Sequence, residues 1–210
     1  MNYHDANSDT SKTREAILDA ACIVFARHPY NAASIRMIAR QARLGHALIG
    51  YYFPAKADLF RAVAARICDD LSAENERWMA EVRRMELHEG FERYVERFVA
   101  FSREKPWVLR IIMLNITGER VGAIPGQDIL IEAIEGIRRM FVTTMKLTAS
   151  VEEVGRFSDS FNALVLYYLG APESAAWLIR MDPDGPEYFP WVEETLVSVF
   201  LPMIGRLFER

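Results

Sequence analysis

The sequence predicts an all-α protein, and two observations support that class. Apolar residues recur three and four positions apart through most of the 210 residues, the period of a helix with one buried face. Alternation of apolar and polar residues, the pattern of a half-buried strand, never lasts longer than chance. Hydrophobic residues make up 51% of the chain and charged residues 26%, so intrinsic disorder and collagen-like structure are excluded.

The first expected element is a helix near 12–28. Ile17 and Phe25 lie on its apolar face, and Ser11 or Thr13 is available as the N-terminal cap. The His-Pro-Tyr-Asn run that follows ends this helix, because proline lacks the N–H that a helix interior requires.

Two short helices follow, joined by a three-residue turn. Ser34 is the expected N-cap of the first, which ends before the turn at 43–45. The second covers 46–52 and buries Ile49, and Pro54 stops it because the residue before a proline avoids the helical region.

The remaining helices have broader apolar faces. Ser150 and Glu153 have the spacing of a capping box, and proline and glycine mark a loop at 118–126. The expected helices cover 56–84, 89–104, 107–117, 128–148, 150–169 and 190–208, with a short helix near Trp177.

Charge is distributed unevenly along the chain. Residues 1–61 contain eight basic and five acidic side chains, whereas the remainder contains 17 basic and 24 acidic ones, for a net charge of −4 overall. A basic segment on an otherwise acidic chain favours contact with a polyanion at one end only.

Several classes of protein are excluded. No run approaches the roughly 20 apolar residues of a membrane span, and the polar N-terminus lacks the apolar core of a signal peptide, so we expect no membrane partner and a cytoplasmic protein. Cys22 and Cys68 are too few for a disulfide framework and are expected to be reduced thiols. The histidines lack ligand spacing, so we expect no metal and no cofactor. The nucleophile, phosphate-loop and metallopeptidase motifs of enzymes are absent, so we expect no enzyme.

The two short helices and their turn have the proportions of a helix-turn-helix, whose second helix enters the DNA major groove. Short paired helices also occur in inert bundles, so proportions alone leave both interpretations open. Residues 34–44 and 49–60, above all the Tyr52-Phe53-Pro54 run with Lys56 and Leu59, resemble the N-terminal domain of the TetR (tetracycline-repressor-like) family.

This resemblance covers roughly residues 12–62. It implies a helix-turn-helix DNA-binding domain at 12–62, with the motif at about 34–53, and a ligand-binding and dimerisation domain at 63–210. The chain departs from the family pattern at Arg43, which stands where glycine is usual, and at Gly50, which stands where tyrosine is usual.

Phosphate contacts are expected from four residues. Lys56 lies at a helix N-terminus, where a bound phosphate would offset the unfavourable meeting of a cation with the helix dipole. Ser34 can cap its helix and also contact phosphate, as the family resemblance implies. Arg36 and Arg43 are expected to contact phosphate, with a plain solvated arginine as the alternative for each.

Base contacts are expected from the outward face of helix 46–52. His46 can bond to a base edge, and Leu48 can contact a thymine methyl group. Tyr52 is expected to span the core of the N-terminal DNA-binding domain and bring its hydroxyl to the DNA backbone. The DNA-facing residues of the turn and second helix are Gly45, His46, Ala47, Leu48, Tyr51 and Tyr52.

Aromatic and methionine side chains are numerous in the second domain. An ordinary bundle core explains most of them, but the family resemblance implies a small-molecule site there. Arg110 either recognises an anionic ligand or pairs with Glu104 or Glu119, and we favour pairing because an unpaired buried arginine is costly. The expected pocket residues are Trp107, Arg110, Met113, Phe141, Met145, Phe161, Tyr168 and Trp177, with Asn115 and Asn162 as further polar candidates.

The last two long helices carry apolar residues on more than one face. One apolar stripe on each helix would suffice for the core. The additional apolar residues therefore predict a four-helix interface with a second copy of the chain related by a two-fold axis, as the resemblance also implies. Two heads would then meet successive major grooves about 34–36 Å apart. The expected interface residues are Phe157, Leu164, Leu196, Phe200, Met203 and Leu207.

These features together predict a homodimeric, ligand-responsive transcriptional regulator, most simply a repressor. Its expected partners are a palindromic double-stranded DNA operator and an unidentified, largely apolar small molecule that releases it. The alternative is a ligand-binding or interaction protein whose head no longer binds DNA, for which Gly50 and Leu48 give some reason. Salt-dependent DNA binding separates the two.

Overall fold

The computed structural model describes residues 3–117, 120, 122–145 and 147–208, and these residues form ten helices and no strand. The all-α prediction is therefore confirmed. The helices are α1 (Tyr3–Arg27), α2 (Ile35–Ala42), α3 (His46–Tyr52), α4 (Lys56–Val82), α5 (Leu87–Glu104), α6 (Pro106–Ile116), α7 (Gln127–Thr144), α8 (Val151–Gly170), α9 (Pro172–Ile179) and α10 (Tyr188–Arg206).

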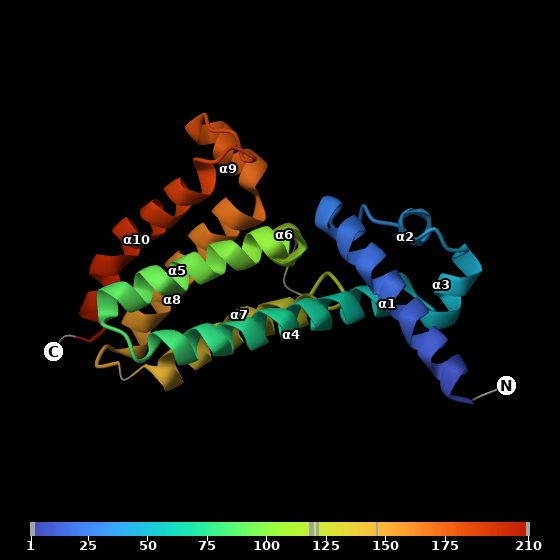
Figure 1. The fold of residues 1–210 in the computed structure, drawn as a ribbon, viewed down its shortest axis with the longest axis horizontal. Helices are drawn as coiled ribbons and strands as arrows, with labels where there is room; N and C mark the ends of the chain where they lie inside the picture. Colours follow the sequence, from blue (N-terminus) through green and yellow to red (C-terminus); the bar gives the residue numbers. More distant parts are fainter. Residues whose placement is uncertain (1–2, 118–119, 121, 146, 209–210) are drawn as a thin grey trace.

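The molecule has a small head and a larger body (Figure 1). Helices α1–α3 form the head at one end, and α4 begins there and runs along the body. Helix α7 lies against α4, while α5, α6, α8 and α10 complete the bundle. The predicted boundary after residue 62 therefore falls inside one continuous helix, which is shared by head and body.

Most predicted helix limits are confirmed, and two are wrong. Helix α1 begins at Tyr3, so Ser11 and Thr13 lie within the helix and neither caps its start. Helix α7 ends at Thr144 rather than at 148. The chain turns away there because the N–H groups of Thr148 and Ala149 donate to the Leu207 carbonyl at the end of α10.

The core of the head is formed by side chains from α1, α2 and α3 and from the first turns of α4. Ile17, Ile38 and Ile49 are fully buried, and the rings of Phe25 and Phe60 meet edge to face with centroids 4.8 Å apart. Each helix of the head is too short or too polar to be stable alone, so this shared burial holds them together.

Both cysteines are free and buried. Burial raises the pKa of the Cys22 thiol to about 11 and that of the Cys68 thiol to about 12, so neither is a thiolate at neutral pH. In the described ranges, no helix has both the length and the apolarity required to cross a bilayer.

The junction of α8 and α9 depends on a hydroxyl group from α10. The Tyr168 carbonyl lacks its usual helical donor because the residue four positions later is Pro172, which has no N–H. The hydroxyl of the fully buried Tyr188 donates to this carbonyl at 2.7 Å. Burial raises the pKa of the Tyr188 hydroxyl, so it stays protonated and remains a donor.

We therefore expect Tyr188→Phe to lower the free energy of unfolding by about 1–3 kcal/mol, since it leaves a buried carbonyl without a partner. Urea denaturation followed by circular dichroism measures the change. Tyr167→Phe, at a half-exposed position on α8, is the control and should change stability by less than about 0.5 kcal/mol. Equal effects of the two substitutions would contradict this account.

Candidate nucleic-acid interface and body cavity

The helix-turn-helix is held by local backbone signals. The Ser34 hydroxyl accepts from the Met37 N–H at 3.3 Å and caps α2, as predicted. Helix α2 ends at Arg43, whose φ of 56° lies in the left-handed region. A non-glycine residue there costs about 1 kcal/mol, which explains why glycine suits this turn. Gly45 then occupies the N-cap of α3 in extended conformation.

Helix α3 presents one face to solvent and one to the head core. Ile49 is fully buried and anchors the helix, while His46 and Ala47 are exposed. Leu48 is 39% exposed and Tyr51 is 78% exposed, so two large apolar groups face outward. An outward face of this composition has no core to pack on and is available for contact with another molecule.

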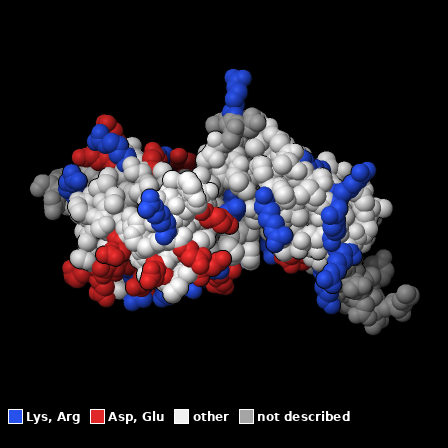
Figure 2. All heavy atoms as spheres, turned by 90° about the horizontal axis from the view of Figure 1, so that it is seen from above, with Lys and Arg blue, Asp and Glu red and all other residues white. Residues whose placement is uncertain are grey.

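Charged side chains are distributed differently over the head and body. Figure 2 shows Asp and Glu side chains gathered over the body on the visible face, whereas Lys and Arg dominate the head. Arg36, Arg40 and Arg43 of α2 and its turn are exposed. The head therefore carries an accessible basic surface beside the outward face of α3.

Lys56 has a different environment from the one we predicted. Its ammonium donates to the carbonyls of Tyr30 at 2.8 Å and Ala33 at 2.9 Å, and lies 4.2 Å from the centre of the Tyr30 ring. Partial burial lowers its pKa. Lys56 therefore ties the α1–α2 loop to the start of α4, and its contact with phosphate stays a prediction.

Two polar side chains connect the head to the body through the opposite side of this loop. The fully buried Asn115 of α6 accepts from the Tyr30 N–H at 2.8 Å, and its own N–H₂ group donates to the Ile111 carbonyl. Gln127, also fully buried, donates from the first turn of α7 to the Asn115 carbonyl at 2.9 Å. The sequence placed Asn115 near the pocket and did not single out Gln127, because their partners lie far away in the chain.

Arg110 supports the same junction. Its Nε donates to the Ala26 carbonyl at 3.0 Å, at the end of α1, and its guanidinium pairs with Glu173 of α9. Arg110 pairs with a glutamate, as predicted, but with Glu173 rather than Glu104, and Glu119 lies outside the described residues.

The body contains a cavity of about 680 Å³, counting its open mouth. It lies between the last turns of α4 and α7, the start of α5, and the sides of α8 and α10. The lining is mostly aromatic and aliphatic and includes three methionines. The lining residues are Met79, Val82, Met85, Glu86, Leu87, Gly90, Phe91, Tyr94, Ile137, Arg138, Phe141, Met145, Phe157, Ser158, Phe161, Asn162 and Ile204.

Three of the eight predicted pocket residues line this cavity, namely Phe141, Met145 and Phe161, and the candidate Asn162 does so as well. The other five lie elsewhere, because apolar character does not reveal which neighbour covers a side chain. Trp177 is 77% exposed on α9. Those outside the cavity lining are Trp107, Arg110, Met113, Tyr168 and Trp177.

Two of the polar side chains at the cavity, Tyr94 and Arg138, are engaged in the structure, and Glu86, Ser158 and Asn162 line it as well. The Tyr94 hydroxyl donates to the buried Asn75 at 2.7 Å, and burial raises its pKa. Arg138 pairs with Glu135 on the same helix. The walls thus offer a ligand a large apolar surface and few free polar groups.

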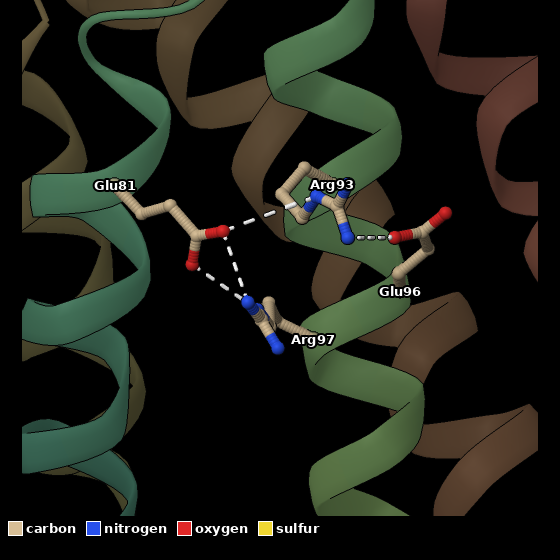
Figure 3. Close-up of polar contacts among 4 residues, drawn as sticks. All are labelled: Glu81, Arg93, Glu96 and Arg97. Atoms are coloured by element: carbon tan, nitrogen blue, oxygen red, sulfur yellow. Dashed lines mark hydrogen bonds and ion pairs between the residues drawn. The ribbon is translucent and has the colours of Figure 1, made fainter.

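An ion-pair cluster braces the hairpin of α4 and α5 that forms one wall of the cavity (Figure 3). Glu81 of α4 accepts two hydrogen bonds from Arg97 of α5, at 3.0 and 3.1 Å, and lies 3.9 Å from Arg93. Arg93 also pairs with Glu96 at 2.9 Å. The bonds from Arg97 hold the pKa of Glu81 below its usual value. All four side chains face solvent, so the cluster orients the hairpin more than it stabilises the fold.

The predicted dimer residues have two different environments. Phe157, Leu196, Phe200 and Leu207 are buried in the core of their own chain, and Phe157 lines the cavity, so these four predictions are wrong. The stripe they form faces inward because α8 and α10 pack against each other and against α5. Leu164 and Met203 are half-buried.

The chain is similar to known proteins in its head and in its fold. Residues 17–63 match the model of the bacterial regulatory proteins of the tetR family. The HTH-type transcriptional repressor LfrR of Mycolicibacterium smegmatis is 42% identical over 66 residues. That match spans 31% of this chain and 34% of LfrR, about a third of the relative's length.

Two solved structures share the fold over most of their length. A tetR-family transcriptional regulator from Streptomyces coelicolor has a TM-score of 0.66 at 20% identity, covering 93% of this chain and 81% of that one. The transcriptional regulator FadR from Bacillus subtilis, in complex with stearoyl-CoA, has a TM-score of 0.59 at 16% identity, covering 88% and 97%.

An exposed helix-turn-helix joined by one long helix to a helical body defines a class of two-domain DNA-binding proteins. Within that class, residues 17–63 match the DNA-binding head of the tetR family, and the chain as a whole shares the fold of a solved tetR-family regulator.

The contacts of Lys56 lead to a prediction about stability. Lys56→Met should lower the free energy of unfolding by about 1.5–3 kcal/mol, because two carbonyls lose a charged donor. Arg36→Met, on the exposed face of α2, is the matched control and should change stability by less than about 0.5 kcal/mol. Urea unfolding measures both, and a Lys56 variant as stable as the control would restore a purely DNA-directed role for this residue.

Proposed function

We propose that the chain is a homodimeric transcriptional repressor that binds a palindromic operator in double-stranded DNA and is released by a small, largely apolar molecule. It acts in the cytoplasm, through binding alone and without a cofactor. The observation that carries this proposal is the outward face of α3, where exposed Leu48 and Tyr51 stand beside the exposed arginines of α2. An apolar and aromatic face beside a basic surface suits a helix that meets base edges between two rows of phosphates.

The phosphate contacts are proposed for Ser34, Arg36 and Arg43, and the base contacts for His46, Ala47, Leu48 and Tyr51. Tyr52 is half-buried and meets Tyr51 edge to face, which suits a hydroxyl that reaches the DNA backbone from within the head. Gly45 leaves the N-terminus of α3 uncovered, because no side chain extends from the cap.

A two-fold dimer is proposed through the outward faces of α8 and α10. Leu164 and Met203 remain available there, and Val199 of α10 is 45% exposed. Two copies of α3 would then read two half-sites one turn of DNA apart.

The body cavity is the proposed site of the releasing molecule. FadR, which shares the fold, was solved in complex with stearoyl-CoA, and this supports a ligand-binding role for the fold. Binding would favour one of two arrangements of the head and body, and operator affinity would change by the difference in affinity between them.

Operator binding is tested on DNA selected from genomic fragments, with mobility shifts at several salt concentrations. We expect two protomers per site and a steep negative slope of log affinity against log salt, about −0.9 per neutralised phosphate. Arg36→Ala should reduce the magnitude of this slope by about 2 for a dimer, whereas Leu48→Ala should weaken specific binding by about 1–3 kcal/mol per half-site without changing the slope. Absence of salt-dependent binding would favour the alternative of an interaction protein with a non-binding head.

The cavity is tested with two fluorescent probes that share one ring system. Neutral N-phenylnaphthylamine should bind at least about tenfold more tightly than anilinonaphthalene sulfonate, since Arg138 is already paired and the other charged lining residue, Glu86, has the same sign of charge as the sulfonate. Ser158→Phe fills the cavity and should abolish probe binding, whereas Ser160→Phe, on the exposed side of the same helix, should leave it unchanged. Equal binding by both variants would place the probe elsewhere.

A further inference from the structure

The α1–α2 loop is held between two helices that belong to different parts of the molecule. The Tyr30 carbonyl accepts from Lys56 of α4, while the Tyr30 N–H, on the other side of the residue, donates to Asn115 of α6. Four residues later, Ser34 caps α2 and starts the helix-turn-helix. The position of this one residue therefore bears directly on the placement of α2.

Asn115 is fixed from the side of the body by α7. Its carbonyl accepts from the Gln127 side chain, which in turn accepts from the Gly122 N–H at 2.7 Å. Gly126, just before α7, has φ of 83°, and an added Cβ would lie 3.3 Å from the Arg61 Cα of α4. The start of α7 is thus wedged against α4 at the head end, and glycine is required there.

The other end of α7 forms part of the cavity wall. Ile137, Arg138 and Phe141 line the cavity from the last turns of this helix, and Met145 follows directly. A helix is stiff along its axis, so a displacement at one end is transmitted to the other. One helix therefore reaches from the proposed ligand site to the hydrogen bonds that hold the Tyr30 N–H.

We propose that Asn115 and Gln127 are positioning residues for DNA binding, which hold the α1–α2 loop in register with α7. Movement of α7 at the cavity then reaches the helix-turn-helix through Gln127, the Asn115 peptide and the Tyr30 N–H. The effect on DNA binding rests on the proposed function. The hydrogen-bonded connection between α7 and the α1–α2 loop is a property of the protein with or without DNA. Helix α4 holds the same loop by a separate bond from Lys56 to the Tyr30 carbonyl.

The experiment measures hydrogen exchange at the Tyr30 amide in the full chain, with isotope-labelled tyrosine and NMR, and Tyr30→Phe assigns the signal. Asn115→Leu should speed this exchange by about tenfold, because the acceptor is lost. Gln127→Met should also speed it several-fold, although Gln127 does not touch Tyr30. That second effect is the one which a purely local role of Asn115 would not produce.

Tyr188→Phe is the control, because Tyr188 is an equally buried polar side chain whose bond to the Tyr168 carbonyl joins α10 to α8 and does not involve α7. It should destabilise the fold without a specific effect at the Tyr30 amide, after correction for global unfolding. Equal acceleration by Tyr188→Phe and Gln127→Met overturns the proposal, as does wild-type exchange in Gln127→Met.

Operator binding supplies a separate measurement. Substitution of a positioning residue should lower the affinity for the operator about tenfold or more. It should leave the slope of log affinity against log salt unchanged, since the phosphate contacts remain the same in number. Unchanged affinity in both variants contradicts the positioning role. If the wild-type chain binds no DNA, the proposed function fails, whereas the exchange measurements still decide whether α7 is connected to the loop.

Discussion

The peptide groups of Tyr30 are partly buried between the head and the body, so they require partners inside the protein. Tyr30 meets this requirement on both sides, by donating to Asn115 and accepting from Lys56. Its ring packs near the rings of Phe25 and Phe60. Apolar packing alone has little directional preference, whereas hydrogen bonds do. The orientation of the helix-turn-helix on the body is therefore set by a few directional bonds.

The same requirement shapes the body. Pro172 removes the donor of the Tyr168 carbonyl, and the Tyr188 hydroxyl from α10 replaces it. Asn75 of α4 lies where this helix meets α5 and α7, and it bonds to Tyr94 of α5 and Met140 of α7. Because these polar groups satisfy one another, the cavity beside them is left with largely apolar walls, and its chemistry follows from the bonds that hold the bundle together.

Cations illustrate how one residue type takes different roles. Arg36 and Arg43 are exposed and free to meet phosphate, whereas Lys56 and Arg110 lie beside backbone carbonyls and support the junction of head and body. Lys56 bonds to carbonyls 23 and 26 residues away, and Arg110 to one 84 residues away. Nothing in their immediate sequence distinguishes these two groups.

The sequence by itself determined the all-α class, the limits of α2 and α3, and the outward face of α3, because caps, prolines and helical periodicity act between near neighbours. Only the tertiary structure decided that Phe157, Leu196 and Phe200 face their own core, that Trp177 faces solvent, and that Asn115 and Gln127 meet. Periodicity shows that a helix has an apolar side, but which element covers that side depends on how distant segments pack. Burial is thus a property of the whole fold, whereas helix limits belong largely to the local chain.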